Sequence, residues 1–513
     1  MCSRGCLAVA WACFLAFTLC QLRDVVAGES IWSGTSVAIN ETRVLDGSET
    51  LTFQNCTVLL QEHKIILKDR AELRMSDCQV KGKGGIYAYN DSKIDLIGVV
   101  WGKEMYTPVN LEAYGASSLG IQNCGLYATG MYLCPALIQT SGNVSIVSSN
   151  LSGARQITGG SVLVMRSRVV GCYYPGLAIG GRRTTILDSV FYGVGEISSQ
   201  VGFEGDEIYL GSTTIESDHV GIKSSGVLTI CSGSRIEARS GGSLGCSDIR
   251  LSASSMNISK SSISSWCWGD WWGHLTLTGG SILIVDSDLW SRGLFGEPLG
   301  TSLRLTGTVV SVRNSNISAQ GYVWPGFDTV SDLSLIAEII RIKSSFLKCT
   351  ANRPSIRIEG NANIVDTEIR VIPPEDTARN RWIIISYPVT VLNSSIGPGP
   401  EFEAFPSVGV VLSLQPPGPC DEVFIDLWPM GDPKFTMYDD GTHGDLEPND
   451  GKYSHFLYVS LDARKAVWTL PAWSISGGRY GLQTITLTIP VPETWVLIVS
   501  VGLSFTLGSC IQP

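Results

Sequence analysis

A six-residue pattern of apolar and polar positions recurs at least thirteen times along the chain. Each copy reads apolar, any residue, turn-former, small residue, any residue, apolar. Examples are Phe53–Val58, Met75–Val80, Ile121–Leu126, Ile284–Leu289, Val312–Ile317, Ile364–Ile369 and Val391–Ile396. A pattern that returns at this interval predicts stacked structural repeats.

The interval between copies varies although the pattern itself does not. The first four copies begin at Phe53, Met75, Leu96 and Ile121, which are 22, 21 and 25 residues apart. We therefore expect insertions in the loops between the repeated segments. Flanking segments such as Leu275–Thr278 alternate apolar and polar residues, which predicts strands.

The middle of the pattern predicts a sharp corner. Its third residue is Asn, Asp, Gly or Ser in every copy except Arg166, and these residue types favour turns. Its fourth residue is Cys, Ser or Thr in every copy except Val99, so this position requires a small side chain. The two apolar ends are expected to face a shared core.

Short strands, a polar corner and a period near 22 residues resemble the right-handed parallel β-helix of pectin-degrading enzymes and many surface proteins. The resemblance covers roughly residues 40–400. It implies coils about 4.8 Å apart, with corner Asn side chains that bond the backbone of adjacent coils. A β-sandwich or a propeller is the alternative, but a propeller blade needs about 40 residues.

A second domain is predicted after Pro400, where the pattern stops. The segment Phe435–Ser454 contains Asp-Asp-Gly-Thr, Gly-Asp and Asp-Gly-x-Tyr. It resembles a stretch of small immunoglobulin-like domains in exported microbial proteins. The fold class is therefore predicted to be all-β, with a right-handed parallel β-helix solenoid over residues 28–400 and a small β-sandwich over 403–490.

The N-terminal residues 1–27 predict a secretory signal peptide. Arg4 precedes an apolar run from Leu7 to Leu19, and the small residue Ala27 fits a cleavage site. The alternative is a membrane anchor, for which the run is short. We therefore expect an exported protein at the cell surface or in the extracellular space.

The C-terminal tail, residues 491–513, leaves two interpretations open. Trp495–Gly508 is almost wholly apolar, and Val491–Glu493 is similar to the opening of a bacterial C-terminal sorting signal. That signal continues with a second Pro and ends in a basic cluster, whereas this chain has Thr494 and no such cluster. The tail is either a membrane or surface tether, or a buried final strand or hydrophobic tail.

The net charge argues against one class of partner, and the cysteines leave two interpretations open. The net charge of −10 and the absence of a basic stripe argue against nucleic acid. Of the 15 Cys, four lie in residues 1–27, which leaves an odd number. Cys56 and Cys78 occupy the same position of successive repeats, so they form either a disulfide or two buried thiols. The chain has no CxxC motif and no paired His residues, so no zinc site is predicted.

Two acidic segments are candidate sites. The first contains Glu204, Asp206, Asp218 and His219, where a carboxylate pair would act as acid and base on a glycosidic bond, bind calcium, or only be solvated. The second contains Asp439, Asp440, Asp445 and Asp450, where oxygen ligands on a Gly-rich turn would hold calcium. The alternative for the second is a turn in which Asp bonds its own backbone.

A Trp-rich segment is the candidate ligand surface. It contains Trp266, Trp268, Asp270, Trp271, Trp272 and His274. Flat aromatic rings stack on sugar rings, and clustered exposed aromatic residues indicate an interface. The alternative is a loop whose Trp residues form a local core.

These observations predict an exported, non-catalytic surface protein that binds carbohydrate or builds the cell envelope, with a polysaccharide or envelope glycan as partner. The alternative is a polysaccharide lyase or glycoside hydrolase acting on an acidic polysaccharide. Arg341-Ile342-Lys343 matches one short element of polygalacturonases, whose companion elements are absent upstream. A groove lined by carboxylates and by Lys or Arg from neighbouring coils would favour the enzyme. A surface covered by Ser, Thr and Asn would favour the structural role.

Overall fold

The computed structural model describes residues 28–489, except for 103–109, 116, 128–135, 172–175, 194–198, 241–245, 268–272, 294–299, 322–329, 373–381, 386–388, 393, 397–400, 404–408, 417–419, 427–433, 459–465 and 477–478. Every regular element in this part of the chain is a β-strand. The chain divides into two compact units, Met1–Ile282 and Leu283–Pro513. The predicted all-β class is confirmed, with a parallel β-solenoid followed by small antiparallel sheets.

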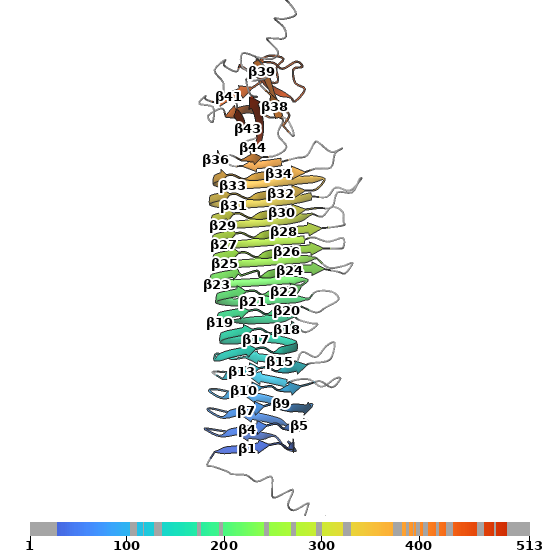
Figure 1. Cartoon of the computed structure of the whole chain (residues 1–513), viewed down its shortest axis with the longest axis vertical. Coiled ribbons are helices and arrows are strands. Elements are labelled where there is room, and N and C mark those ends of the chain that lie inside the picture. Colours follow the sequence, from blue (N-terminus) through green and yellow to red (C-terminus); the bar gives the residue numbers. More distant parts are fainter. Residues whose placement is uncertain are drawn as a thin grey trace, which may run out of the picture. The chain divides into compact units, whose positions relative to one another are not determined.

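The first five coils of the first unit each consist of three short strands (Figure 1). Each strand pairs in parallel with the equivalent strand of the next coil, so that three faces form. The first face contains β1 (Glu29–Ser33), β4 (Thr50–Gln54), β7 (Glu72–Ser76), β10 (Lys93–Ile97), β13 (Ser118–Gln122) and β16 (Asn143–Val147). The second contains β2 (Ser36–Ala38), β5 (Thr57–Gln61), β8 (Gln79–Gly82), β11 (Val100–Trp101) and β14 (Gly125–Tyr127). The third contains β3 (Arg43–Leu45), β6 (Lys64–Leu67), β9 (Gly85–Ala88), β12 (Asn110–Ala113) and β15 (Ala136–Gln139).

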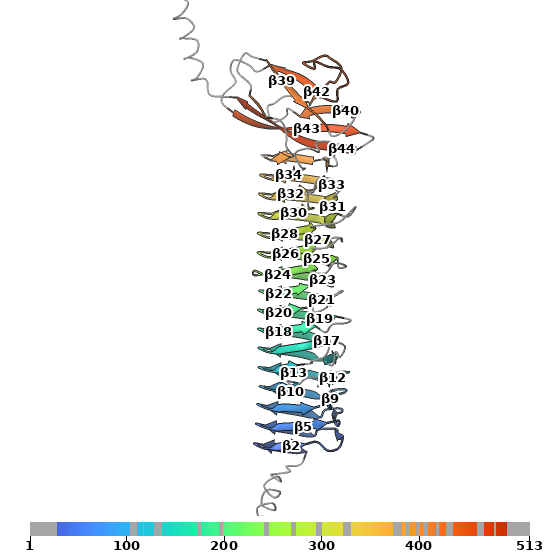
Figure 2. The same cartoon turned by 90° about the vertical axis from the view of Figure 1, so that its right-hand side faces the viewer.

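In the later coils of this unit one long strand serves both the third and the first face, and β17 also carries the second face through Asn150–Ser152. These strands are β17 (Asn150–Met165), β19 (Leu177–Leu187), β21 (Gln200–Gly211), β23 (His219–Cys231), β25 (Ser247–Ser259) and β27 (Gly273–Val285). The second face continues with β18 (Arg168–Gly171), β20 (Val190–Tyr192), β22 (Thr214–Ser217), β24 (Arg235–Ser240) and β26 (Ser262–Cys267). Figure 2 shows β9, β12, β19, β21 and β23 along one side of the unit.

The predicted corner is present in every described copy of the pattern. The third residue has a positive φ in all of them, from 46° at Asn314 to 63° at Gly98, and Arg166 adopts 50°. Asn, Asp and Gly reach this left-handed region at low cost. The exception, Arg166, adopts it as well, so the stacking of the coils dictates the bend at this position.

A ladder of buried hydroxyl groups joins the coils, and it lies one position later than predicted. The fourth residue of the pattern carries it, whereas the corner residue Asn314 donates from Nδ2 to the Asp286 side chain of the preceding coil at 3.2 Å. Ser167 Oγ donates to Met165 O at 2.8 Å and accepts from Ser149 N of the preceding coil at 3.1 Å. Ser149 Oγ accepts from Cys124 N in the same way. Because the hydroxyl satisfies a buried N–H between coils, the small residue of the pattern is a hydrogen-bonding residue.

Replacing Ser167 with Ala is expected to destabilise the first unit by about 1–3 kcal/mol, because Ser149 N–H then loses its buried acceptor. Ser167→Cys is expected to cost less, since Cys124 already accepts from Val99 N at this position. Urea unfolding measures both variants, and Ser145→Ala on the outer side of β16 is the control. Equal midpoints for the Ser167→Ala and Ser145→Ala variants would contradict the role of the ladder.

Three cysteines take the place of the ladder serines in the first coils. Cys56, Cys78 and Cys124 are buried free thiols. Cys56 Sγ donates to Gln54 O at 3.2 Å and Cys78 Sγ to Ser76 O at 3.1 Å. Burial raises the pKa of the Cys78 and Cys124 thiols, which keeps them protonated and poorly reactive. Of the two interpretations of Cys56 and Cys78, the structure has the buried thiols and no disulfide.

The second unit contains further parallel coils and then the antiparallel sheets. The coils consist of β28 (Asp288–Gly293), β29 (Thr301–Arg313), β30 (Asn316–Gln320), β31 (Val330–Lys343), β32 (Phe346–Thr350), β33 (Arg353–Val365), β34 (Glu368–Ile372), β35 (Trp382–Ile385), β36 (Val389–Leu392) and β37 (Ser395–Ile396). The remaining strands are β38 (Glu401–Glu403), β39 (Gly409–Leu414), β40 (Glu422–Asp426), β41 (Lys434–Met437), β42 (Tyr453–Tyr458), β43 (Ala466–Ser476) and β44 (Arg479–Ile489).

Two antiparallel sheets share one core near the C-terminus. One sheet pairs β40 with β41 and β43, and β43 with β44, while β39 pairs with β42. Leu412 and Leu457 from the smaller sheet pack with Val423, Ile425 and Leu470 from the larger one. Within the described residues no helix is long and apolar enough to cross a bilayer.

Candidate functional site

A groove of about 590 Å³ lies on the third face of the first unit, over β17, β19, β21, β23 and β25. Its floor is formed by Ala178, Gly202 and Gly221, which follow one another in register on adjacent coils. Alternate residues of a strand face outward, and here three successive outward positions carry at most a methyl group. The face is therefore hollowed between Gln156 and Arg250, the next residues of the same column.

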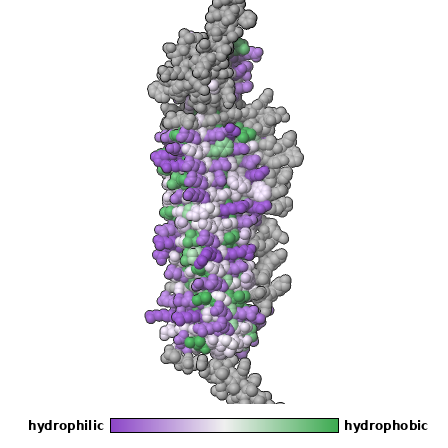
Figure 3. Space-filling view, in the orientation of Figure 1, coloured by the Kyte–Doolittle hydropathy of each residue, from purple (hydrophilic) through white to green (hydrophobic). Residues whose placement is uncertain are grey.

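Polar side chains form the walls of the groove. Lys223 Nζ lies 3.1 Å from Glu204 Oε1 on the neighbouring coil, and both side chains are largely exposed. Arg250 Nε lies 2.7 Å from Asp248 Oδ2. Because each charge is neutralised by a neighbour, the groove presents paired charges and neutral amides such as Gln156, with no strong field of one sign. Figure 3 shows that hydrophobic residues form only small groups on the viewed face of this unit.

The acidic segment predicted as a catalytic candidate is divided among several locations. Glu204 lines the groove, and His219 begins β23 on the same face. Asp206 lies where the third face passes into the first, and its Oδ1 accepts from Ser225 Oγ at 2.6 Å. Asp218 Oδ2 accepts from Ser199 N at 2.8 Å. Asp206 and Asp218 thus bond the neighbouring coils, and only Glu204 and His219 lie on the groove face.

The sequence interpretation missed Asp248, Arg250 and Lys223. Asp248 lies in register with His219 on the next coil, and Arg250 with Gly221. The Oδ1 atom of Asp248 is buried and accepts no hydrogen bond from the described residues. Burial lowers the pKa of His274, with Asp248 opposing this effect and Arg250 adding to it. Asp248, Arg250 and Lys223 can be recognised as neighbours only after the coils are aligned in register, so the sequence alone does not reveal them.

The lowered pKa of His274 predicts a loss of stability in acid. Its folded-state pKa lies below the unfolded value of about 6.5, so the unfolded chain binds more protons as the pH falls. The contribution of His274 is present above about pH 6.5 and is lost below it. His274→Gln is expected to flatten the decline of the thermal midpoint between about pH 7 and about pH 5. An unchanged slope would contradict this prediction.

Only part of the Trp-rich segment lies in the described residues. Trp266 is half-buried in β26, with the guanidinium carbon of Arg239 from the neighbouring coil 4.5 Å from the centre of its ring. His274 lies in β27. Trp268, Asp270, Trp271 and Trp272 lie outside the described residues. The ring of Trp266 is thus covered by a cation from within the solenoid.

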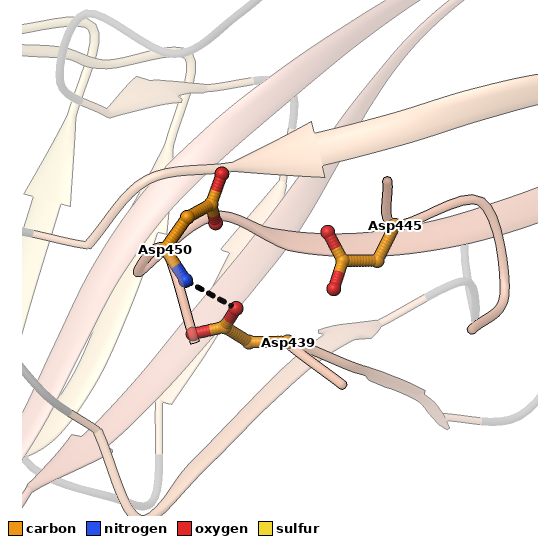
Figure 4. A group of neighbouring side chains, drawn as sticks. All are labelled: Asp439, Asp445 and Asp450. Carbon is orange, nitrogen blue, oxygen red and sulfur yellow. Dashed lines mark hydrogen bonds between the residues drawn. The ribbon is translucent and has the colours of Figure 1, made fainter. Parts of the chain in front are cut away.

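The second acidic segment forms a compact carboxylate cluster in the loop before β42 (Figure 4). One oxygen each of Asp439, Asp445 and Asp450 lie within 4.8 Å of one another. Asp439 also accepts from Asp450 N at 3.1 Å and Gly451 N at 3.0 Å, and the buried Asp445 accepts from Gly441 N at 2.7 Å. The geometry contains both predicted features, a carboxylate cluster suited to calcium and a turn bonded by its own Asp residues.

Asp440 does not belong to this cluster. Its Oδ1 accepts from Thr442 N at 2.9 Å, and the hydrogen bond from the Thr442 hydroxyl lowers the pKa of its carboxyl group. Of the four predicted positions, the structure groups three, Asp439, Asp445 and Asp450.

No protein-family model, no curated protein and no solved structure matches this chain.

Proposed function

We propose that this chain is an exported, non-catalytic surface protein that binds a polysaccharide or an envelope glycan in the groove of the third face. The hollow floor of Ala178, Gly202 and Gly221 is the observation that carries the proposal. Such a floor gives backbone and small side chains close access to a flat ring, and the walls offer Gln156, Glu204 and other hydrogen-bonding groups. Ligand sites are typically concave surfaces with a few convergent polar groups.

Three further features of the chain are proposed: the handedness of the solenoid, the fold of the C-terminal sheets and the role of residues 1–27. The solenoid is proposed to be right-handed and pectin-lyase-like, because crossovers between parallel strands are nearly always right-handed. The antiparallel sheets that share a core are proposed to form an immunoglobulin-like domain. Residues 1–27 are proposed to be a secretory signal, which would bring the groove to the cell surface, where glycans are available.

The positions of the carboxylates favour binding over hydrolysis. Glu204 forms an ion pair with Lys223, and Asp206 and Asp218 accept hydrogen bonds from Ser225 and Ser199. These contacts occupy the three carboxylates within the solenoid, whereas a hydrolase needs two carboxyl groups that flank one glycosidic bond. The three residues are therefore suited to holding coils and hydroxyl groups.

A lyase or hydrolase is the second candidate, and Asp248 is the observation that favours it. Its buried Oδ1 has no hydrogen-bond partner among the described residues, and Asp248 lies in register with His219 of the preceding coil and two residues before Arg250. A buried polar atom without a hydrogen-bond partner is uncommon and indicates a place where a substrate group could bind. Lys223 and Arg250 from neighbouring coils would then neutralise a uronate.

Retention on immobilised polysaccharides tests the proposal. The mature chain from residue 28 is run through gels that contain pectin, alginate, xylan, galactomannan or β-glucan. We expect retardation by at least one of them, with no release of reducing sugar or unsaturated uronide. Release of either product would establish the enzyme, and migration unaffected by all five would contradict carbohydrate binding.

Trp271 and Trp272 test whether the Trp-rich segment takes part. The segment connects β26 to β27, which continues the third face. Stacking on a sugar ring contributes on the order of 1 kcal/mol per aromatic side chain, so the double Ala variant is expected to weaken retention roughly thirtyfold. Unchanged retention would leave the groove as the binding surface without this segment.

A further inference from the structure

A cluster of tyrosines lies on the third face of the early coils, along the side of the first unit that also carries the groove strands β19, β21 and β23 (Figure 2). Tyr87 belongs to β9, and Tyr89 follows that strand by one residue. On the next coil Glu112 belongs to β12, and Tyr114 follows it by one residue. The residue between the members of each pair is fully buried, so all four side chains face outward. We call Tyr87, Tyr89, Glu112 and Tyr114 the tyrosine array.

Contacts between the coils hold the side chains of the tyrosine array in place. The rings of Tyr89 and Tyr114 stack with 5.5 Å between their centres and 15° between their planes. Tyr114 Oη donates to Glu112 Oε2 at 2.7 Å. Lys64 Nζ of the preceding coil lies 4.6 Å from the centre of the Tyr87 ring. Because these side chains are already held, a ligand that binds them loses little further conformational entropy.

The tyrosine array combines exposed ring surface with hydrogen-bonding groups. Tyr89 has 36% of its surface exposed, and Tyr87, Glu112 and Tyr114 are half-buried. Each Tyr offers a flat apolar ring with a hydroxyl group at its tip, and the carboxylate of Glu112 accepts hydrogen bonds. A sugar presents the complementary surfaces, because its ring has apolar C–H faces and a rim of hydroxyl groups. The array therefore has the chemistry of a carbohydrate contact.

The tyrosine array adjoins the groove through the strand register. In the column of the groove floor, Glu112 lies two coils before Gln156, which lines the groove. Thr140 also lines the groove, and its Oγ1 donates at 2.9 Å to the carbonyl oxygen of Gly115, the residue after Tyr114. The array thus begins where the end of the groove nearest the N-terminus stops.

The distance between the two regions sets the length of a ligand that uses both. From β12 the register leads through β15, β17 and β19 to β21, which carries the floor residue Gly202. Coils are about 4.8 Å apart, so these steps cover about 19 Å. Only a chain of several sugar rings covers this distance. Such a chain gains affinity, because its second contact forms at a high effective concentration.

We infer that the tyrosine array is a second subsite of the glycan-binding face, and that the ligand is an extended polysaccharide that follows the third face from β9 to β23. Between the two subsites Gln139 Nε2 donates to Gln156 Oε1 at 2.6 Å, so paired amides lie on the connecting surface. The inference rests on the proposed function and adds the size class of the ligand. That ligand is a polymer of several rings, in contrast to a terminal sugar or a disaccharide.

Binding measured as a function of ligand length tests the inference. The polysaccharide that retains the wild-type chain is cut into fractions of defined length, and calorimetry measures their affinities for the chain from residue 28. The wild type is expected to bind fractions that reach both subsites roughly tenfold more tightly than fractions that fit the groove alone. The double variant Tyr89→Thr, Tyr114→Thr is expected to lose this gain and to bind short fractions as the wild type does. Thr replaces Tyr because it also favours strands.

The control is Tyr209→Thr, which removes a tyrosine that is 39% exposed from the first-face portion of β21. It is expected to keep the whole gain. The single variant Tyr89→Thr is expected to lose part of the gain, and it serves as the test if the double variant does not fold. Equal affinities of the wild type for long and short fractions, or an unchanged gain in the Tyr89 variants, would overturn the inference and leave the groove proposal standing. Failure of every polysaccharide to bind the wild type would overturn both.

Discussion

Gly202→Gln and Gly221→Gln together are expected to abolish binding to the polysaccharide that retains the wild-type chain. A Cβ atom at Gly202 would lie no closer than 3.9 Å to a neighbouring atom, and at Gly221 nothing lies within 4 Å. The two side chains therefore fit without moving the backbone, and they fill the floor of the groove. We expect at least a hundredfold loss of affinity, about 2.7 kcal/mol.

The control for this experiment lies on the same strand. Thr229→Gln places the same side chain on β23 at a half-buried position of its first-face portion, away from the groove. It is expected to leave retention and the unfolding midpoint unchanged. Retention of the Gly202→Gln, Gly221→Gln variant equal to that of the Thr229→Gln variant would show that the groove does not hold the glycan.

Gly181→Ala is expected to be strongly destabilising, although it adds only one methyl group. Its Cβ would lie 2.4 Å from Gly159 O on the preceding coil, and Gly205 on the next coil meets Gly181 O at 2.2 Å in the same way. These glycines form a column where the third face passes into the first. Relief requires neighbouring coils to separate, so we expect a loss of about 3 kcal/mol or more.

Urea unfolding of the first unit measures this effect, with Gly221→Ala as the matched change. Because Gly221 has open space around it, its Ala variant is expected to stay within about 0.5 kcal/mol of the wild type or to gain stability from a stiffer unfolded chain. Similar midpoints for the two Ala variants would mean that the coils yield more readily than their close approach indicates.

The corner of the coil could be predicted from sequence because its physical demands are local. A left-handed residue followed by a small buried one restricts the choice of side chain in every copy, and even Arg166 conforms. What the sequence did not reveal was the reason for the small residue. The sequence indicates only that this position requires a small side chain, whereas Ser149 and Ser167 carry hydrogen bonds between coils. A requirement for a small side chain and a requirement for a hydrogen-bonding side chain both select Ser and Thr. Composition alone therefore does not distinguish the two requirements.

The groove could not be predicted because its residues are aligned only through the strand register. Ala178, Gly202, Gly221 and Arg250 lie in one column, yet they are 24, 19 and 29 residues apart. The loops between them differ in length, so no fixed period connects them. A second corner was missed for a related reason. This corner joins the third face to the first and has positive φ at Asp69, Asn90 and Gly115 in the early coils. From β17 onward it is replaced by a single long strand that continues through both faces.

Hydrogen–deuterium exchange with and without the retained polysaccharide tests the central claim most directly. The account predicts that the ligand slows exchange in residues 177–181, 201–205 and 219–224, the third-face portions of β19, β21 and β23. The first-face portions of the same strands, residues 183–187, 207–211 and 227–231, are expected to exchange as before. Slowing confined to the first face, or none in the three third-face segments at saturating polysaccharide, would contradict the account.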